Sequence, residues 1–191
     1  PNDLSALSPV HWWRCGDGDT SPTLTDNGSG GNNGTMTNFS TFSTDVPVEL
    51  FSRKSIALDG VDDFVNMGNV LDMSNYATNS FTNSAWINTT STSTQMILSK
   101  NLTSAPFNGY ALYMSSGKLR FLIGANPNWL VAEGGSTVYS DGQWHNIVLV
   151  YDGSQNTSGL SFYIDGGLVT TTSLVNNLSL IHISEPTRLS W

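Results

Sequence analysis

The stretch that decides the fold is Asp141-Gly-Gln-Trp-His-Asn-Ile-Val-Leu-Val-Tyr-Asp-Gly153, followed by a polar loop and Leu160-Ser-Phe-Tyr-Ile-Asp-Gly166. The run 144–151 is apolar on both alternating faces apart from His145 and Asn146, which is typical of a strand buried in a sandwich of sheets. The run 160–164 alternates apolar and polar residues, which is typical of a half-buried strand. Because the Asp165-Gly166 pair that closes the second run favours a turn, the pattern predicts a β-hairpin.

Strand signals also dominate on both sides of this hairpin. Before residue 50 the chain is rich in Gly, Asn, Ser and Thr, which favours short strands joined by long loops. No window shows the 3.6-residue apolar period over three turns, so little helix is expected. The further predicted strands are 56–58, 64–67, 81–87, 96–98, 110–114, 119–123, 130–132 and 169–172, with a tight hairpin turn at Ser116-Gly117.

Length and charge limit the classes of function. A chain of 191 residues is long enough for one β-sandwich domain. With 7 basic and 15 acidic residues, the net charge is -8, so no basic surface is available to follow a nucleic-acid backbone. No apolar run approaches the roughly 20 residues of a membrane span, so membrane insertion is not expected. The chain begins at Pro1, and we interpret it as a piece of a longer polypeptide with neighbouring domains.

Several segments together resemble the laminin-G-like domain of the concanavalin A-like lectin and glucanase superfamily. They occur in the order typical of that family, and they are residues 7–13, 26–35, 56–65, 81–87, 141–145 and 162–166. The resemblance implies an all-β jelly-roll sandwich of two antiparallel sheets over residues 1–177. The opening segment 11–19, with 34–38, is similar to laminin-G-like modules of marine bacteriophage structural proteins, which implies an extracellular or virion setting.

The sequence departs from the family pattern at two places. Asn83 stands where the family strand has an apolar residue, which indicates a wet or edge position. The family normally ends with a strand bearing an Asp-Glu-Val-like run, and no such run follows Asn177. The sandwich is therefore expected to lack its closing C-terminal strand.

The C-terminal segment resembles something other than a protein domain. Residues 178–188 resemble the in-frame translation of a transposase adaptor used in sequencing libraries. We therefore expect residues 178–191 to be adaptor read-through, and we exclude them from the fold prediction.

A group of carboxylates is the candidate metal site. Asp59, Asp62 and Asp63 surround Gly60 between two predicted strands. Calcium prefers several oxygen ligands, and some members of the family bind it. Two interpretations stay open: a Ca2+ site with Asp59 as the first ligand, or a simple Asp59-Gly60 turn with solvated neighbours.

Aromatic side chains are the candidates for ligand binding, because a sugar ring can stack on a flat apolar face while Asn side chains bind its hydroxyls. Trp129 is the best candidate, since Pro127, Asn126 and Asn128 place it at the edge of a loop. Trp86 is expected in a sheet.

Catalytic constellations are not evident in the sequence. Retaining glycosidases need two carboxyl groups about 5–5.5 Å apart. Outside the tail, glutamate occurs only at Glu49 and Glu133, and neither lies in an alternating acidic run. His145 is expected to be a hydrogen-bonded structural residue, and Cys15 a buried hydrophobe.

The sequence therefore predicts a non-enzymatic binding or adhesion module. It would recognise a glycan or a protein surface, with possible assistance from Ca2+, within a larger extracellular or virion protein. The alternative is a spacer or decoration domain of a phage particle. A glycoside hydrolase is the third hypothesis and has the least support.

Overall fold

The computed structural model describes residues 4–47, 53–70, 79–100, 108–125 and 128–178. The chain divides into two compact units, Pro1–Asp72 and Met73–Trp191, which we call unit 1 and unit 2. Each unit is described by itself. The expectation of one domain over residues 1–177 stays a prediction.

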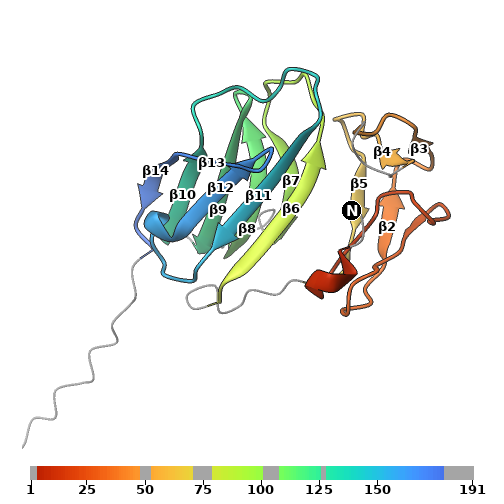
Figure 1. Cartoon of the computed structure of the whole chain (residues 1–191), viewed down its shortest axis with the longest axis horizontal. Helices are drawn as coiled ribbons and strands as arrows, with labels where there is room; N and C mark the ends of the chain where they lie inside the picture. Colours follow the sequence, from red (N-terminus) through yellow and green to blue (C-terminus); the bar gives the residue numbers. More distant parts are fainter. Residues whose placement is uncertain (1–3, 48–52, 71–78, 101–107, 126–127, 179–191) are drawn as a thin grey trace, which may run out of the picture. The chain divides into compact units, whose positions relative to one another are not determined.

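Unit 1 consists of short strands and long loops, as the composition of this part of the chain predicts (Figure 1). One antiparallel sheet has the order β1-β2-β5, and β3 pairs with β4 in a separate ladder. The elements are the 3-10 helix η1 (Ser5–Leu7) and the strands β1 (Thr23–Leu24), β2 (Gly34–Thr37), β3 (Phe42–Ser43), β4 (Ser55–Ile56) and β5 (Phe64–Asn66).

A buried carboxylate organises the loops of unit 1. Asp26 Oδ1 accepts hydrogen bonds from the backbone N–H groups of Trp12 and Gly28, both at 2.8 Å. Asp26 Oδ2 bonds to His11 Nδ1 at 2.7 Å and accepts from Asn32 N–H at 2.9 Å. The side chain of Asp26 has no solvent exposure. One side chain therefore connects three loop segments that have little regular structure of their own.

These hydrogen bonds keep Asp26 ionised. Burial alone raises the pKa of the Asp26 carboxyl, but the N–H of Trp12, the ring of His11 and the N–H groups of Gly28 and Asn32 outweigh it and lower the pKa to about 2. The folded pKa is lower than the unfolded value, so this contribution to stability is present above about pH 3.9 and is lost as pH falls through the folded pKa.

Unit 2 contains a five-stranded antiparallel sheet with the order β14-β10-β9-β8-β7. Its strands are β7 (Gln95–Lys100), β8 (Asn108–Ser115), β9 (Lys118–Ala125), β10 (Asn128–Gly134) and β14 (Thr171–Asn176). We call this sheet the five-stranded sheet.

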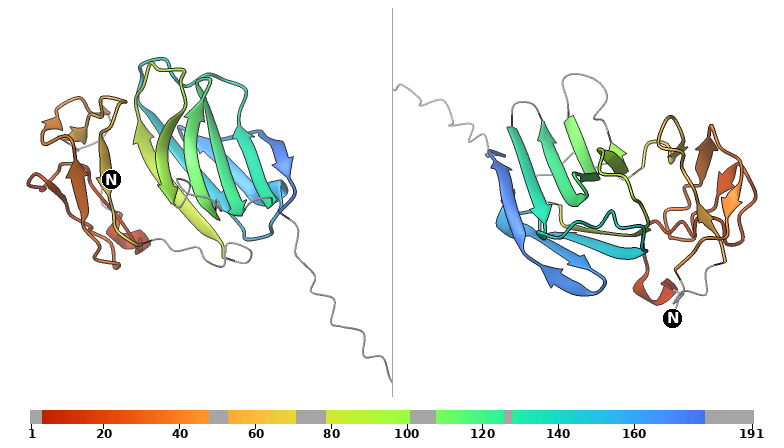
Figure 2. Two further views of the ribbon diagram at one scale, coloured as in Figure 1. Left: turned by 180° about the vertical axis from the view of Figure 1, so that it is seen from behind. Right: turned by 90° about the horizontal axis from the view of Figure 1, so that it is seen from above.

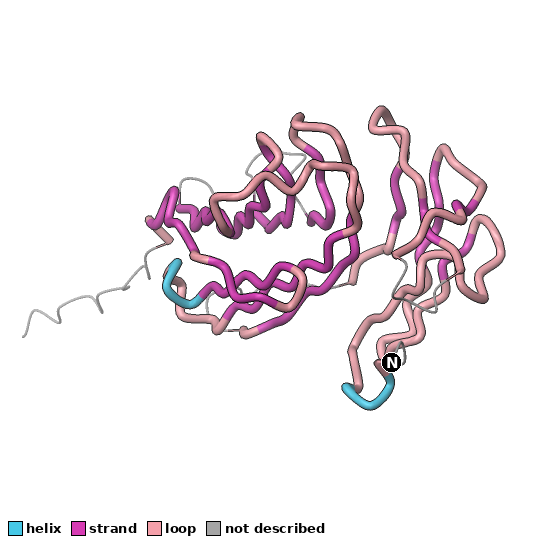
Figure 3. The backbone as a smooth tube through the Cα atoms, turned by 45° about the horizontal axis from the view of Figure 1, so that its top comes forward, coloured by secondary structure: helices cyan, strands magenta, loops and turns pink. Residues whose placement is uncertain are grey.

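The second sheet of unit 2 has four antiparallel strands in the order β13-β12-β11-β6. They are β6 (Phe81–Ile87), β11 (His145–Tyr151), β12 (Leu160–Ile164) and β13 (Gly167–Val169), and the short 3-10 helix η2 (Thr157–Gly159) precedes β12. The view from above shows the two sheets as two layers (Figure 2), and the tube drawing shows how completely strands dominate this unit (Figure 3).

The core of unit 2 lies between the two sheets. Alternate residues of each strand are almost fully buried, as the period-2 pattern predicts. The five-stranded sheet contributes Tyr110, Leu112, Met114, Leu119, Phe121, Ile123, Leu130 and Ala132, and the four-stranded sheet contributes Ile147, Leu149, Tyr151, Leu160, Phe162 and Ile164. The all-β sandwich predicted from the sequence is therefore confirmed.

Two hairpin turns have the chemistry that the sequence predicts. Asp165 and Gly166 have φ angles of 51° and 79°, and Ile164 pairs with Gly167 across the turn. Ser116 and Gly117 have φ angles of 53° and 72°, and they connect β8 to β9. Two consecutive positive φ angles match the twist of antiparallel strands, so these short turns set the register of both hairpins.

Most observed strands differ at their ends from the predicted ranges, and two assignments differ most. The strand predicted at 130–132 is longer and begins at Asn128, because β10 pairs along its length with β9. The strand predicted at 169–172 is two strands, β13 and β14, which belong to different sheets. Alternation alone does not reveal where a chain leaves one sheet for the other.

We predict that Asp26→Asn destabilises unit 1. The asparagine amide has one acceptor oxygen, which replaces Oδ1, and an NH2 group, which replaces Oδ2. The NH2 group is a donor, so the backbone N–H of Asn32 loses its acceptor. The expected loss is about 3 kcal/mol in the free energy of unfolding, measured by urea denaturation, with faster hydrogen exchange at Asn32. Thr44→Ala, at an exposed position of the same unit, is the control and should change stability by less than about 0.5 kcal/mol. Equal urea midpoints for Asp26→Asn and the wild type would contradict the assignment.

Candidate functional site

The three acidic residues predicted as a metal site lie together in unit 1. One carboxylate oxygen from each of Asp59, Asp62 and Asp63 lies within 4.8 Å of the others. Asp59 Oδ1 accepts the backbone N–H of Val61 at 2.8 Å, and Asp63 Oδ2 accepts the N–H of Asp59 at 2.9 Å. The loop before β5 therefore turns its own carboxylates toward one point.

This donor set fits a hard cation. Calcium binds oxygen ligands at about 2.3–2.6 Å, so oxygens around one ion lie up to about 5 Å apart. Asp59 and Asp62 are exposed and Asp63 is half-buried, which leaves the group open to water as further ligands. The same arrangement is also a turn closed by hydrogen bonds, since Gly60 has a φ of 76°.

Trp129 is the second residue of β10, one position after the strand begins at Asn128. The backbone N–H of Trp129 donates to Asn177 Oδ1 at 2.6 Å, and the backbone carbonyl of Trp129 accepts from the backbone N–H of Asn177 at 3.0 Å. It is half-buried and pairs across the ladder with Gly124. A Cβ at Gly124 would lie 3.0 Å from Cε3 of the Trp129 ring, so this indole packs over the glycine. Asn128 begins the same strand, and Asn126 lies outside the described residues.

Trp129 belongs to the outward face of the five-stranded sheet, which we call the outer face. Leu130 and Ala132 are fully buried in the core, so the alternate residues Trp129, Val131 and Glu133 point outward. Pairing in register extends this face to the neighbouring strands. The row through Val131 contains Val175, Leu122, Ala111 and Ser99, and the row through Glu133 contains Thr172, Arg120, Tyr113 and Met96.

A compact ion-pair network occupies part of the outer face. Lys118 Nζ donates to Glu133 Oε1 at 2.9 Å, and Arg120 Nε donates to Glu133 Oε2 at 3.0 Å. Arg120 also donates to Ser115 Oγ at 3.3 Å. Two cations therefore share one nearly buried carboxylate, and the network carries a net positive charge in a chain whose total is -8.

The network determines what Glu133 can do chemically. Burial raises the pKa of the Glu133 carboxyl, but the hydrogen bonds and charges of Lys118 and Arg120 outweigh it and hold the pKa below its ordinary value. The general acid of a glycosidase needs the opposite shift. Glu133 is thus an ionised structural carboxylate, and Glu49 lies outside the described residues.

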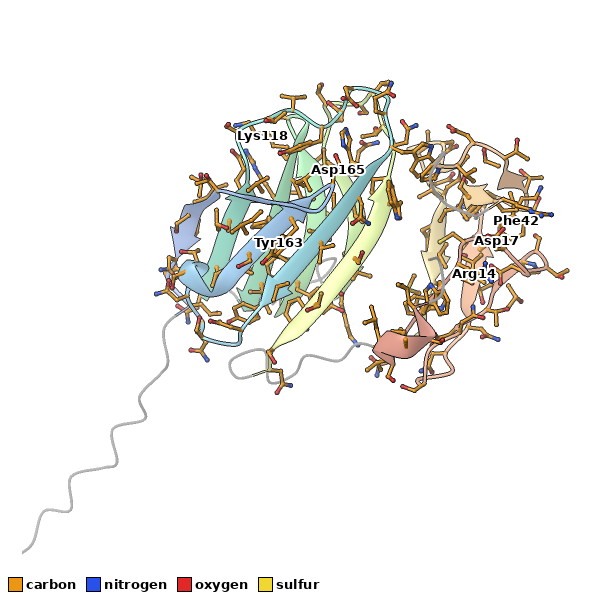
Figure 4. All side chains as sticks on the ribbon, viewed as in Figure 1. Arg14, Asp17, Phe42, Lys118, Tyr163 and Asp165 are labelled. Carbon is orange, nitrogen blue, oxygen red and sulfur yellow. The ribbon has the colours of Figure 1, made fainter. Side chains whose placement is uncertain are left out.

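His145 is a structural histidine, as expected. Its Nδ1 bonds to Asp165 Oδ2 at 2.8 Å and its Nε2 to Asp141 Oδ1 at 3.2 Å. Asp165 lies in the turn that follows β12 (Figure 4), and its Oδ1 accepts the N–H of Asn146 at 2.8 Å. Burial lowers the pKa of His145, but the hydrogen bonds and charges of Asp165 and Asp141 raise it above its ordinary value. The imidazole connects two loops.

Cys15 offers no nucleophile. Burial, followed by the charge of Asp19, raises the pKa of its thiol to about 11. The Sγ atom contacts the carbonyl of Trp13 at 3.7 Å. Cys15 is half-buried, and the raised pKa disfavours the thiolate, which is the reactive form of cysteine.

The comparison with known protein families agrees with this geometry. The family model described as the concanavalin A-like lectin/glucanases superfamily, of the laminin G type, matches residues 59–186, which is well over half of the chain. The chain belongs to this family. The matched range extends beyond Asn177, and the adaptor origin of residues 178–191 stays a prediction.

Among solved structures, the chain is similar to a crystal structure of residues 221–444 of an S-layer domain-containing protein from Clostridium thermocellum ATCC 27405. The match covers 90% of this chain and 74% of that chain, with 21% identity and a TM-score of 0.50. At this identity the likeness concerns the fold alone. No curated protein matches the sequence.

Family membership and fold support a carbohydrate- or protein-binding module. No helix in the described part of the chain is long and apolar enough to cross a membrane.

Sequence reasoning did not single out the network of Lys118, Arg120 and Glu133. The signal was present, because alternation along β9 places Lys118 and Arg120 on one face, but the pairing of β9 with β10 is needed to place Glu133 beside them.

The contacts of His145 predict a pH dependence of stability in unit 2. Its folded pKa is raised, so its contribution is full below the unfolded pKa of about 6.5 and is lost as pH rises through the folded value. Asp165→Asn should lower the pKa of His145 toward about 6.5, measured by NMR titration of the imidazole Cε1–H. The exposed Asp152→Asn in the same unit should leave it unchanged. A wild-type pKa at or below the unfolded value would refute the arrangement.

Proposed function

We propose that this chain is a non-catalytic glycan-binding module, assisted by Ca2+, within a larger extracellular or virion protein. The proposed binding surface is the outer face of the five-stranded sheet around Trp129. The calcium ion would bind at Asp59, Asp62 and Asp63. A protein surface is the other class of partner that the family supports, and the binding experiment below separates the two.

One observation carries the proposal: the outer face combines a flat indole with hydrogen-bonding groups. The ring of Trp129 contacts Gly124 on the neighbouring strand, where a Cβ would lie 3.0 Å from Cε3 of the indole. The neighbouring residues Val131 and Leu122 are half-buried and apolar. Sugar rings stack their C–H faces on such surfaces, while hydroxyls need donors and acceptors at the edge. The donors of Lys118 and Arg120, whose side chains are 30% and 27% exposed, lie on the same face.

The same network supports a role without catalysis. A glycosidase acting on this face needs a carboxyl group that is protonated near neutral pH. Glu133 has a lowered pKa, and its two oxygens already bond to Lys118 and Arg120. These groups are suited to binding hydroxyls, since their donors and acceptors are fixed in place by one another.

Calcium would act by ordering the loop that precedes β5. Three carboxylates with oxygens within 4.8 Å repel one another when no cation is bound. A calcium ion removes this repulsion and fixes the loop, whose Asp62 carbonyl already accepts a hydrogen bond from Asn38 Nδ2 at 2.8 Å. Calcium is therefore expected to stabilise unit 1.

Glycan binding is tested by Trp129→Ala. The chain is screened with Ca2+ against immobilised glycans, and the affinity for any glycan found is measured by calorimetry. Loss of the stacking surface should weaken binding by about tenfold, or about 1.4 kcal/mol. Trp86→Ala is the control, because it removes a tryptophan side chain that is exposed on β6, in the other sheet. Equal losses in both variants, or binding to proteins but to no glycan, would contradict the proposal.

Calcium binding is tested separately by calorimetric titration of the chelator-treated chain with CaCl2. Asp62→Asn should weaken calcium binding by about tenfold or more, because one charged ligand is lost. Asp45→Asn, an exposed carboxylate outside the group, is the control. Unchanged calcium affinity in Asp62→Asn would remove the calcium site and leave the glycan proposal standing.

A further inference from the structure

One loop of unit 2 begins beside the ion-pair network of the outer face and ends at His145. Residues 135–144 connect β10, which ends one residue after Glu133, to β11, which begins at His145. β10 and β11 belong to different sheets, so this loop crosses from the five-stranded to the four-stranded sheet (Figure 1). We call it the crossing loop. A change at its His145 end can therefore reach the outer face through the chain itself.

The middle of the crossing loop packs on the turn that precedes Lys118. The backbone N–H of Tyr139 donates to the carbonyl of Gly117 at 2.7 Å. A Cβ at Gly117 would lie 2.5 Å from Cγ1 of Val138 and 2.6 Å from Oγ of Ser140, so the loop lies directly against the turn. The crossing loop therefore supports the turn from which one cation of the network extends.

The far end of the crossing loop is fastened by His145. Nε2 of His145 lies 3.2 Å from Oδ1 of Asp141 in the loop, and Nδ1 lies 2.8 Å from Oδ2 of Asp165 in the turn after β12. The ring of Tyr139, which is almost fully buried, meets the imidazole edge-on at a centroid distance of 5.5 Å. β6, whose Ile87 pairs with His145, carries no charged residue. Among the described residues, the charges that act on the imidazole are thus two carboxylates, one at each ring nitrogen.

These contacts of His145 are both satisfied only while the ring is charged. An imidazolium donates from both nitrogens, whereas a neutral imidazole has one donor and one lone pair. The contact with Asp165 is the shorter one, and the same carboxylate accepts the N–H of Asn146, so we expect the remaining proton on Nδ1. Nε2 then turns its lone pair toward the carboxylate of Asp141, which loses its donor.

We propose that His145 is a pH-dependent latch on the crossing loop. When His145 loses its proton, Asp141 is released, residues 138–140 leave Gly117, and the pairing of Lys118 with the network on the outer face loosens. The sandwich stays folded, since the buried hydrophobic residues of unit 2, with one exception in the loop, lie on strands.

The direction of the switch follows from the two carboxylates. The pKa of His145 is raised above its ordinary value, so the latch is closed below about pH 6.5 and opens as pH rises through the folded pKa. The latch would thereby regulate the proposed glycan-binding surface. That consequence rests on the proposed function, whereas the latch itself does not.

The experiment is a pH titration of the isotope-labelled 191-residue chain by NMR, from about pH 5 to about pH 9. The ring nitrogens of His145 report its protonation. The backbone carbonyl signals of Tyr139, Gly142 and Lys118 report the loop and the turn, and the N–H of Gly142 bonds to the carbonyl of Thr89 while the loop is closed. All these signals should titrate with one midpoint, and the neutral ring should carry its proton on Nδ1.

Asp141→Asn distinguishes the latch from an ordinary structural histidine. An amide can accept from an Nε2–H group or donate to an Nε2 lone pair, so it holds the loop in both protonation states. The backbone signals of Tyr139 and Gly142 should therefore lose their titration in this variant, while His145 still titrates. Asp152→Asn, at an exposed carboxylate that bonds within its own turn, is the control and should behave as the wild type.

Three results would overturn the latch: backbone signals that stay constant while His145 titrates, a wild-type titration of the loop in Asp141→Asn, or a neutral ring protonated at Nε2. None of these readouts uses a ligand, so the latch and the proposed function can fail separately. For a glycan found in the screen, the affinity of the wild type should fall as pH rises through the His145 midpoint and stay constant in Asp141→Asn. A wild-type affinity that is constant across the midpoint would rule out regulation of the outer face.

Discussion

The packing of Phe81 against aromatic rings of both sheets is the contact on which unit 2 depends. The Phe81 ring lies 5.4 Å from Tyr151 of its own sheet, and 5.7 Å and 6.5 Å from Phe121 and Tyr110 of the facing sheet. Tyr151 and Phe121 are fully buried, and Tyr110 is nearly so. These rings join β6 to three central strands, β11, β9 and β8, so the two layers are aligned by a small number of large side chains.

Once the layers are aligned, alternation places every other residue on an outward face. The outer face of the five-stranded sheet acquires Trp129, an apolar row and the network around Glu133, all from residues that were not needed in the core. The same geometry gives His145 two carboxylate partners from two loops. The proposed binding surface and the loop contacts are thus consequences of strand register and not separate additions to the fold.

The sequence predicted the parts of this fold that depend on local pattern. The hairpin from β11 to β12, and the Asp165-Gly166 turn that joins β12 to β13, are where alternation and turn chemistry place them. The structure also confirms Asn83 at an edge position.

Contacts between distant residues were not predictable. Asp26 looked like part of a glycine-rich turn, and its bond to His11 spans 15 residues. Trp129 was predicted at the edge of a loop from its neighbours in sequence. Its partners Gly124 and Asn177 are set by pairing across the sheet, which the local sequence does not reveal.

The central claim is that the outer face around Trp129 binds glycans. The most direct test is an NMR titration of the isotope-labelled chain, in calcium, with the glycan that it binds best in the screen. The account predicts that the amide signals that shift belong mainly to β9 and β10 around Trp129, Leu122 and Glu133. Shifts confined to unit 1 or to the four-stranded sheet, with the outer face unaffected, would contradict it.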